Sequence, residues 1–393
     1  MKFIDDIDVS GKRLFMRMDY NVPVKNGVIQ DETRIVQSLP TLRHALDNGA
    51  SLVLSSHLGK PKGKVVPELT LAPVAKRVGE LLGMDVPLAP DCIGDEVMSM
   101  VTSLKAGQII MLENLRFHEG ETANDPEFAK ALAKLGDIYV DDAFGLAHRA
   151  HASNVGVTQY AQMSCGGLLL KKEWEFLGKA LHNPERPYIA VSGGSKVSTK
   201  MGILKSLIKH VDAMIIGGAM ANTFLLAQGF NPGGSLVERD HLDDAKEVLK
   251  LAEEKGVTLH LPMDFILGKG IEDSTPSGTC DAGDIPDDQM ALDVGPKTVE
   301  SFTQALAGVK TVLWNGPVGV FENPAFAAGS KALAKCIAGL DALTIVGGGD
   351  TDALIHSEHM ADQFDFISTG GGSFLEFMEG ADLPAFKALK EAC

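Results

Sequence analysis

The sequence predicts an α/β protein made of two doubly wound, parallel-sheet domains. Short apolar runs typical of strands alternate with longer segments typical of helices, a pattern that favours parallel strands joined by crossover helices. Clusters of Gly, Asp, Asn, His and Arg follow directly after many of these runs. Ligands of open parallel sheets bind beyond the carboxyl ends of the strands, so the clusters mark an expected active site. A chain of 393 residues is also longer than a single hydrophobic core usually serves, so we expect two domains.

The expected elements follow this alternation along the chain. In the first half, strands are expected at 14–16, 51–54, 109–112 and 139–142, and helices at 32–48, 70–82 and 126–135. Pro126 follows Asn124-Asp125 and suits a first helical turn. In the second half, strands are expected at 188–192, 212–216, 257–261, 310–314, 342–346 and 364–368.

A domain boundary is expected near residues 165–187. A helical stretch, 168–181, ends before Asn183-Pro184-Glu185-Arg186-Pro187. Two prolines so close together make a linker. The helix before them is then a candidate connector between the domains.

Composition excludes several classes of protein. The formal net charge is −16, which argues against nucleic acid or an anionic membrane as a partner. No run approaches the ~18 apolar residues of a membrane helix, and the acidic N-terminus lacks the apolar region of a signal peptide. The five cysteines are scattered without metal-ligand spacing, which suits free thiols in a reducing cytosol. We therefore expect a cytoplasmic protein.

The two halves carry different chemical groups. Residues 1–170 hold seven arginines and residues 171–393 hold two, whereas glycines number 15 and 27. Guanidinium forks bind carboxylates and phosphates bidentately. Glycine-rich turns at helix N-termini let backbone amides approach nucleotide phosphates. The first half is thus equipped for a small anion and the second for a nucleotide.

The run from Gly193 to Lys200 follows a predicted strand. Lys196 and Lys200 have the i, i+4 spacing of neighbours on one helical face. Cations oppose the macrodipole at a helix N-terminus, which indicates a bound anion. The alternative is a solvated lysine pair on a surface helix. The motif is no P-loop, since GxxxxGK[ST] and GxGxxG are both absent from the chain.

Two further glycine turns follow strands in the second half. Asp350 follows Gly347-Gly348-Gly349, where it suits either Mg²⁺ binding or an N-cap. A second tri-glycine turn runs from Gly370 to Gly372. Asn315 and Glu322 follow another strand, as candidates for the metal and the ribose, although a solvated acid is an equal alternative for Glu322.

Polar side chains also follow the strands of the first half. These candidates are Asp19, Asn21, Arg34, His57, Arg116, His148, Arg149 and His151. Several convergent cations imply a small ligand with more than one negative group. The open alternatives are a helix ion pair for Arg34, beside Asp31 and Glu32, and a structural role for a lone histidine.

Together these motifs resemble the phosphoglycerate kinase family. The similarity runs from Met18-Asp19-Tyr20-Asn21-Val22-Pro23 to Ser368-Thr369-Gly370-Gly371-Gly372. It implies phosphoryl transfer between 1,3-bisphosphoglycerate and Mg-ADP, giving 3-phosphoglycerate and ATP, by a monomer whose domains close about a hinge. It also implies a phosphoglycerate domain (1–170), a connecting helix and hinge (171–187), a nucleotide domain (188–375) and a C-terminal segment (376–393) that packs on the first domain.

The resemblance assigns a role to each motif residue. The implied phosphoglycerate ligands are Asp19, Asn21, Arg34, His57, Lys60, Arg116 and Arg149. The implied nucleotide ligands are Lys200, Gly217, Gly218, Asn315, Glu322, Gly348, Gly349, Asp350 and Thr351, with Asp350 on Mg²⁺. The implied catalytic groups are Arg34, Lys196, Lys200, Gly348 and Gly371, with the amide of Gly372 supporting the phosphates. Lys60 stands where the family usually has Arg, and a lysine cannot reproduce a bidentate fork.

Such a reaction needs no general base, because the carboxylate that accepts the phosphoryl group is already ionised. Positioning, Mg²⁺ and electrostatic stabilisation would supply the catalysis. Two other classes stay open. A nicotinamide-dependent dehydrogenase would be expected to carry GxGxxG. A non-enzymatic anion-binding protein would not need the combined Lys, Asp and Arg set.

Overall fold

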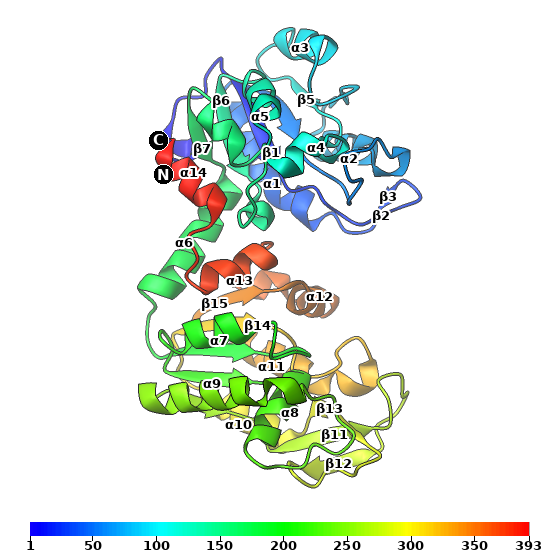
Figure 1. The fold of residues 1–393 in the computed structure, drawn as a ribbon, viewed down its shortest axis with the longest axis vertical. Helices are drawn as coiled ribbons and strands as arrows, with labels where there is room; N and C mark the ends of the chain where they lie inside the picture. The colour runs from blue at the N-terminus through cyan, green and yellow to red at the C-terminus, as the bar shows by residue number, and fades with distance from the viewer. Residues whose placement is uncertain (393) are drawn as a thin grey trace. The chain divides into compact units, whose positions relative to one another are not determined.

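The computed structural model describes residues 1–392 and divides the chain into two compact units (Figure 1). Unit 1 comprises Met1–Glu175 together with the segment from Asp382 onward, and unit 2 comprises Phe176–Ala381. The division falls within helix α6 (Leu168–His182), the expected connector. The chain therefore passes between the units twice, once in α6 and once after Ala381.

Unit 1 is built on a five-stranded sheet whose strands all run parallel, in the order β5-β4-β1-β6-β7. The strands are β1 (Arg13–Met18), β4 (Ser51–Ser55), β5 (Ile109–Met111), β6 (Ile138–Asp142) and β7 (Ser164–Gly166). In register, Arg17 lies opposite both Ser55 and Asp141. The carboxyl ends of the three central strands therefore meet at one edge. A small hairpin, β2 (Val24–Lys25) and β3 (Val28–Ile29), follows β1.

Helices cover both faces of this sheet. One group, α1 (Thr33–Asp47) and α2 (Ala72–Leu82), packs together over a core that includes Met16, Leu42, Leu52 and Val74. The other helices are α3 (Asp95–Thr102), α4 (Glu119–Ala123), α5 (Pro126–Ala133) and α14 (Pro384–Glu391). As expected, α5 begins at Pro126, and the Asp125 side chain accepts a hydrogen bond from the Phe128 amide as its cap.

Helix α14 closes unit 1 although it comes last in the chain. The Ala385 amide donates to the Ala147 carbonyl at 3.1 Å. The Phe386 ring meets Trp174 edge-on, with centroids 5.0 Å apart, and lies 5.9 Å from the ring of Phe144. Aromatic contacts of this kind stabilise beyond the area they bury. The C-terminal helix thus returns to the first domain, as the predicted fold class requires.

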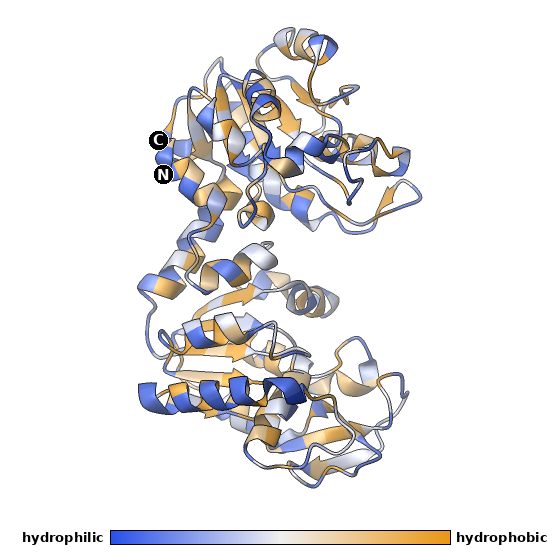
Figure 2. Ribbon diagram, in the orientation of Figure 1, coloured by the Kyte–Doolittle hydropathy of each residue, from blue (hydrophilic) through white to orange (hydrophobic). Residues whose placement is uncertain are grey.

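Unit 2 is built on a six-stranded parallel sheet in the order β10-β9-β8-β14-β15-β16. The strands are β8 (Tyr188–Ser192), β9 (Ala213–Ile216), β10 (Thr258–His260), β14 (Thr311–Asn315), β15 (Leu343–Gly347) and β16 (Phe366–Ile367). All six match runs expected from the sequence. Figure 2 shows the inner strands in the orange of apolar residues, as burial on both faces demands.

Two groups of helices flank this second sheet. One group contains α7 (Met201–Leu207), α8 (Gly218–Ala227), α9 (Leu242–Lys255) and α13 (Gly372–Met378). The other contains α10 (Pro296–Ala305), α11 (Ala328–Ala338) and α12 (Gly349–Ser357). Together with unit 1, this arrangement confirms the predicted fold class of two doubly wound α/β domains.

The sequence did not predict a small antiparallel sheet in unit 2. Its order is β12-β11-β13, from β11 (Asp264–Gly268), β12 (Gly278–Asp281) and β13 (Met290–Val294). Strand β12 is largely exposed and reads Gly-Thr-Cys-Asp, so it lacks the apolar run that marks a buried strand. Phe265 and Leu267 of β11 form a separate small core with Leu225 and Ile285.

Candidate active site

Polar groups gather beyond the carboxyl ends of β1 and β4. The Asn21 side-chain oxygen accepts a hydrogen bond from the Gly59 amide at 2.9 Å. Asp19 accepts one from Arg34 Nη1 at 2.8 Å. Two loops and the start of α1, far apart in sequence, therefore converge on one edge of the sheet.

Arg34 does not form the local helix ion pair that was its alternative interpretation. Its partner is Asp19, on the loop after β1. Glu32 instead pairs with Arg77 of α2, with 2.6 Å between Oε2 and Nε. The guanidinium of Arg34 is about one-third exposed, so part of its hydrogen-bonding capacity faces solvent.

Arg116 lies on a 3₁₀ turn, η3 (Leu115–Phe117), after β5. Its Nη1 donates to the Gly59 carbonyl at 2.8 Å, and its buried Nε has no partner among the described residues. Burial, together with the neighbouring charges of Arg17 and Arg149, lowers the pKa of Arg116 to about 10. The Arg116 Nε lacks a hydrogen-bond acceptor and lies among positive charges, so this position favours the binding of an anionic ligand.

His57 is buried at the centre of these cations. Arg17 Nη2 lies 3.2 Å from His57 Nδ1. Because a guanidinium only donates, Nδ1 must accept and the ring proton must sit on Nε2. Burial holds the pKa of His57 well below its usual value, and the charges of Arg17, Arg116, His151 and Arg34 act in the same direction. His57 is therefore a neutral imidazole that donates through Nε2.

The sequence did not predict a buried network of charged and polar side chains beneath His57. Arg17 is fully buried and lies 3.7 Å from Glu121, which is also fully buried. Glu121 accepts from the Ser153 hydroxyl at 2.6 Å, and its carboxylate lies 3.6 Å from His151 Nδ1. Although burial alone would raise it, His151, Arg17 and Ser153 hold the pKa of Glu121 below its ordinary value. The available signal was a charge, Arg17, inside the apolar run Leu14–Met18.

Two predicted ligands of unit 1, Lys60 and Arg149, are exposed. Arg149 sits on a loop that Asn154 holds in place. The Asn154 amide donates to the carbonyls of Leu146 and Arg149, at 3.0 and 2.8 Å, and its oxygen accepts from the His151 amide. The influence of Arg149 on Arg116 indicates that the loop brings its charge toward the same cluster.

In unit 2, Lys200 projects onto the end of β14. Its Nζ donates to both the carbonyl and the side-chain oxygen of Asn315, the first at 3.2 Å. Burial lowers the pKa of Lys200 to about 8, an effect that the charge of Asp350 partly opposes. The amine is thus desolvated and close to an acidic side chain on a neighbouring turn.

The expectation that Lys196 and Lys200 share a helical face is wrong. Helix α7 begins at Met201, so both lysines lie on the preceding loop, and Lys196 is exposed. The loop is held by Glu238, which accepts from the amide and the hydroxyl of Ser198 at 3.0 and 2.6 Å. These bonds fix a non-helical conformation that local spacing does not reveal.

The glycine turn after β15 packs against the end of β14. The Asn315 amide donates to the Gly347 carbonyl at 2.7 Å, and the Gly316 amide donates to Thr351 Oγ1 at 2.7 Å. Thr351 is fully buried, so its hydroxyl supports the loop from beneath. Helix α12 has its N-cap at Gly348. Asp350 is the second residue of that helix, and the N-cap interpretation of Asp350 is therefore wrong.

Close backbone approach explains two of the glycines near this site. A Cβ on Gly193 would lie 2.0 Å from the Pro317 carbonyl oxygen, and one on Gly218 would lie 2.5 Å from the Gly194 carbonyl oxygen. Gly218 also has a φ of +67°, which side chains rarely adopt. Glycine is needed here so that three strand-end loops can meet.

A cavity of about 320 Å³ opens beside these loops in unit 2. Among the predicted residues, Gly218, Glu322 and Asp350 line it. Its apolar lining, which the sequence did not predict, includes Leu236, Phe265, Ile271, Leu292 and Val318. Gly217 is buried nearby at the N-terminus of α8, and Gly371, with φ +50°, is the N-cap of α13.

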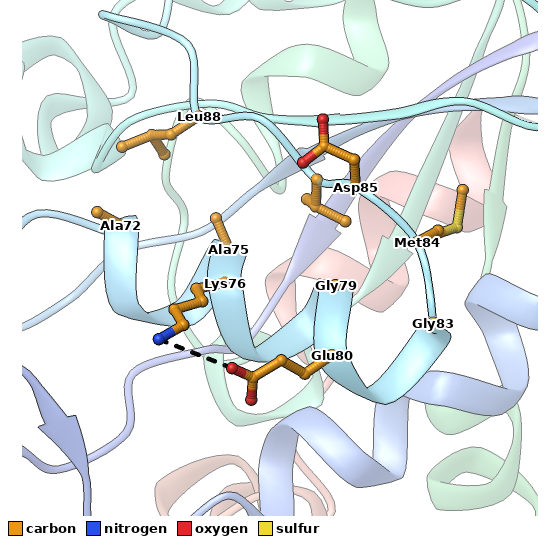
Figure 3. Close-up of a pocket in the computed structure, with 10 residues that line it drawn as sticks. Ala72, Ala75, Lys76, Gly79, Glu80, Gly83, Met84, Asp85 and Leu88 are labelled. Carbon is orange, nitrogen blue, oxygen red and sulfur yellow. Dashed lines mark ion pairs between the residues drawn. The ribbon is translucent and has the colours of Figure 1, made fainter.

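Another hollow, of about 500 Å³, lies outside this region, along α2 of unit 1. Figure 3 shows the Lys76–Glu80 ion pair on the helix and the segment from Met84 to Leu88 facing it. None of the predicted site residues lines it. The hollow therefore adds nothing to the candidate active site.

Taken together, the fold and the two clusters define a nucleotide-dependent phosphotransferase of the two-domain α/β class. The phosphoglycerate kinase family model matches residues 4–381. A curated phosphoglycerate kinase of Maridesulfovibrio salexigens is 58% identical over 396 residues, covering 100% of both chains. The solved structure of phosphoglycerate kinase from Coxiella burnetii has a TM-score of 0.91 and 43% identity, covering 99% of this chain and 98% of its own. That from Pyrococcus horikoshii OT3 has a TM-score of 0.84 and 31% identity, covering 100% and 99%.

The chain belongs to the phosphoglycerate kinase family. It is a kinase that transfers a phosphoryl group between 1,3-bisphosphoglycerate and ADP, with Mg²⁺ and with ADP or ATP as co-substrate. The predicted family, activity and cofactors are confirmed. Among residues 1–392, no helix has both the length and the apolar character needed to cross a membrane.

Proposed function

We propose that unit 1 binds the phosphoglycerate and that unit 2 binds the Mg-nucleotide. The carrying observation is the convergence of arginine charges on one neutral histidine, His57, in unit 1. Arg34, Arg116 and Arg149 would neutralise the phosphate and carboxylate groups of the substrate. The proposed phosphoglycerate ligands are Asp19, Asn21, Arg34, His57, Lys60, Arg116 and Arg149.

Each proposed ligand has a physical role. His57 would donate a neutral hydrogen bond from Nε2 without adding a charge. Asp19 holds Arg34, and Asn21 holds Gly59, whose carbonyl in turn orients Arg116. The cluster is thus prearranged by hydrogen bonds, so little reorganisation accompanies binding.

In unit 2, the apolar lining of the cavity suits the flat ring of a nucleotide base. The glycine turns beside it present backbone amides that suit the nucleotide phosphates. Glu322 is exposed at the cavity and would accept the ribose hydroxyls. Lys200 would contact the phosphates, and Lys196 would approach them from its loop. The remaining proposed nucleotide ligands are Gly217, Gly218, Asn315, Gly348, Gly349, Asp350 and Thr351, with Gly371 and Gly372 supporting the transferring group.

The residues around Asp350 fit a magnesium ion. Asp350 is an exposed carboxylate in the first turn of α12, beside a cavity lined by glycines. Mg²⁺ typically binds one or two carboxylates together with substrate phosphates. When bound, the ion would offset the charge of the nucleotide phosphates. Asp350 is the residue that we propose holds it.

The protein's own part in the reaction is then positioning and charge stabilisation. Arg34, Lys196, Lys200 and the glycine amides would stabilise the charge of the transferring phosphoryl group. Phosphoryl transfer needs reacting atoms within ~3–3.5 Å. Because each unit would bind one substrate, we infer that the reaction passes through a closed state that also excludes water. The ternary complex should therefore have a smaller radius of gyration than the free protein.

Calorimetry on two matched pairs of variants tests the assignment of ligands to units. Arg116→Met should weaken 3-phosphoglycerate binding at least ~10-fold and leave Mg-ADP unchanged, whereas Arg43→Met, on the exposed part of α1, should change neither. Asp350→Asn should weaken Mg-ADP alone, and Asp362→Asn, also exposed in unit 2, should not. If Arg116→Met weakened the nucleotide instead, the assignment would be wrong.

A cytoplasmic monomer is the remaining part of the proposal. The glycolytic reaction and the free cysteines Cys92, Cys280 and Cys336 support a reducing compartment. Cys393 lies outside the described residues. Sedimentation at micromolar concentration tests the oligomeric state.

A further inference from the structure

Three metal-ligating side chains meet in unit 1, and none of them is a proposed substrate ligand. One ligand atom each from Asp91, Cys92 and His118 lies within 4.8 Å of the other two. Asp91 Oδ1 and His118 Nε2 are 2.5 Å apart. The group therefore unites carboxylate, thiol and imidazole donors from segments 26 residues apart.

The surroundings allow an ion to enter the group and stay there. The Asp91 and His118 side chains are 49% and 29% exposed, so the open side faces solvent, whereas Cys92 is buried. Burial raises the pKa of the Cys92 thiol well above its usual value, the carboxylates of Asp91, Glu121 and Glu113 act in the same direction, and the charge of Arg17 opposes them. A bound cation would offset the charge of these carboxylates and stabilise the thiolate.

Two contacts limit how far these side chains can move. The Cys92 thiol donates to the Glu113 carbonyl at 3.0 Å, and its amide donates to Asp91 Oδ1 at 2.6 Å. The His118 ring stacks on Phe128 with centroids 5.0 Å apart. Supports of this kind orient ligands in known metal centres.

We propose that Asp91, Cys92 and His118 form a binding site for a zinc-class divalent cation. Nitrogen, sulfur and carboxylate ligands are the set that Zn²⁺ prefers, and three protein ligands with one open position complete a tetrahedron with water. At zinc bond lengths the donors would lie about 3.3–3.8 Å apart. The Asp91–His118 contact must therefore open by about 1 Å. Binding releases the Cys92 thiol proton to solvent, and the thiolate bonds to the ion. The proton that His118 Nε2 donates to Asp91 moves to Nδ1 or to solvent, which frees Nε2 to ligate the ion.

The site flanks the turn that carries Arg116. The Cys92 thiol donates a hydrogen bond to the carbonyl of Glu113, just before η3, which loss of the thiol proton would break. His118 is the C-cap of η3. Opening the Asp91–His118 contact would pull on the end of this turn and shift Arg116 from the Gly59 carbonyl. We therefore expect the ion to weaken 3-phosphoglycerate binding about fivefold. This coupling, unlike the site itself, rests on the proposed function.

Cobalt substitution in the full chain tests the site directly. Co²⁺ added to metal-free protein should give one equivalent of a thiolate-to-cobalt charge-transfer absorption, which Zn²⁺ then removes. Cys92→Ser should abolish the band, and His118→Gln should weaken Co²⁺ binding at least ~10-fold. Cys336→Ser, a free cysteine in unit 2, should change neither. Because Cys92 is buried and His118 is partly exposed, the His118→Gln variant decides the result if Cys92→Ser does not fold.

The absence of a cobalt band in folded wild-type protein, or equal affinity in wild type and His118→Gln, would overturn the site. The coupling is measured separately, by titrating 3-phosphoglycerate into protein with one bound Zn²⁺ and into Cys92→Ser with the same total zinc. Equal affinities with and without zinc in the wild type would overturn the coupling. Neither outcome depends on turnover, so each is distinguishable from a failure of the proposed reaction.

Discussion

The proposed contact between Lys200 and the nucleotide phosphates should make nucleotide binding depend on pH. Burial lowers the pKa of this lysine in the free protein to about 8. Bound polyphosphate would hold the amine charged, which raises its pKa above the range of the experiment. Binding must then take up a proton wherever the free protein has lost one.

The expected size of this effect follows from the value of the pKa. The neutral fraction of Lys200 in the free protein is about one-tenth at pH 7, one-half at pH 8 and nine-tenths at pH 9. Mg-ADP binding should take up protons in the same proportions. Because the bound form is charged, affinity falls as pH rises through the pKa of the free lysine. The loss should be about tenfold at pH 9, or ~1.4 kcal/mol.

Titration calorimetry in buffers of different ionisation enthalpy measures the uptake. The nucleotide phosphates, with a second pKa near ~6, are fully ionised above pH 7.5 and contribute no protons there. Lys200→Met should abolish the buffer dependence, whereas Lys196→Met, which changes an exposed lysine on the same loop, should keep it. Binding heats that do not vary with buffer between pH 8 and 9 would refute the reasoning. So would an unchanged proton uptake in Lys200→Met.

Three further predictions concern unit 1. Glu121→Gln should lower the free energy of unfolding by ~3–5 kcal/mol at pH 7, measured with urea, because it leaves Arg17 buried without its counter-charge. The pKa of Glu121 is depressed, so its contribution is lost as pH falls through the folded value, and the gap between variant and wild type should close in acid. Arg34→Ala should reduce turnover ~100-fold while sparing Mg-ADP affinity, and near-normal turnover would remove it from the mechanism. If Lys60 contacts the substrate, Lys60→Arg should maintain or lower the KM for 3-phosphoglycerate and Lys60→Ala should raise it; two unchanged KM values would make Lys60 a surface residue.

The sequence predicted those parts of the fold that depend on local patterns. The inner strands β8, β9, β14 and β15 of the unit 2 sheet are largely buried and mostly apolar, and α5 starts where Asp125 and Pro126 place it. Strand β12 escaped prediction because it is exposed and polar. The supposed helix through Lys196 and Lys200 was wrong because Ser198 bonds to Glu238, forty residues away, and no local pattern reports that contact.

The candidate site, too, contains residues that local sequence patterns predict and residues that depend on contacts distant in sequence. Candidate residues at or just after strand ends, such as Asp19, His57 and Asn315, could be predicted to lie together because parallel topology brings strand ends together. The support beneath them could not be found, since Arg17 meets Ser153 across 136 positions and a buried ion pair has no sequence period. The apolar cavity of unit 2 was missed for a related reason, because Phe265 and Leu292 come from the sheet that the sequence did not reveal.

The return of α14 to unit 1 sets the order in which a ribosome can complete the two units. The sheet of unit 1 is made first, but the helix that carries Phe386 onto Trp174 emerges only after all of unit 2. At ~5–20 residues per second, roughly 10–40 s separate the two events. During translation the amino-terminal sheet must persist with part of its surface uncovered, while unit 2 has its whole sequence available. We expect unit 2 to be the first to reach its finished structure on the ribosome, even though its sequence comes second.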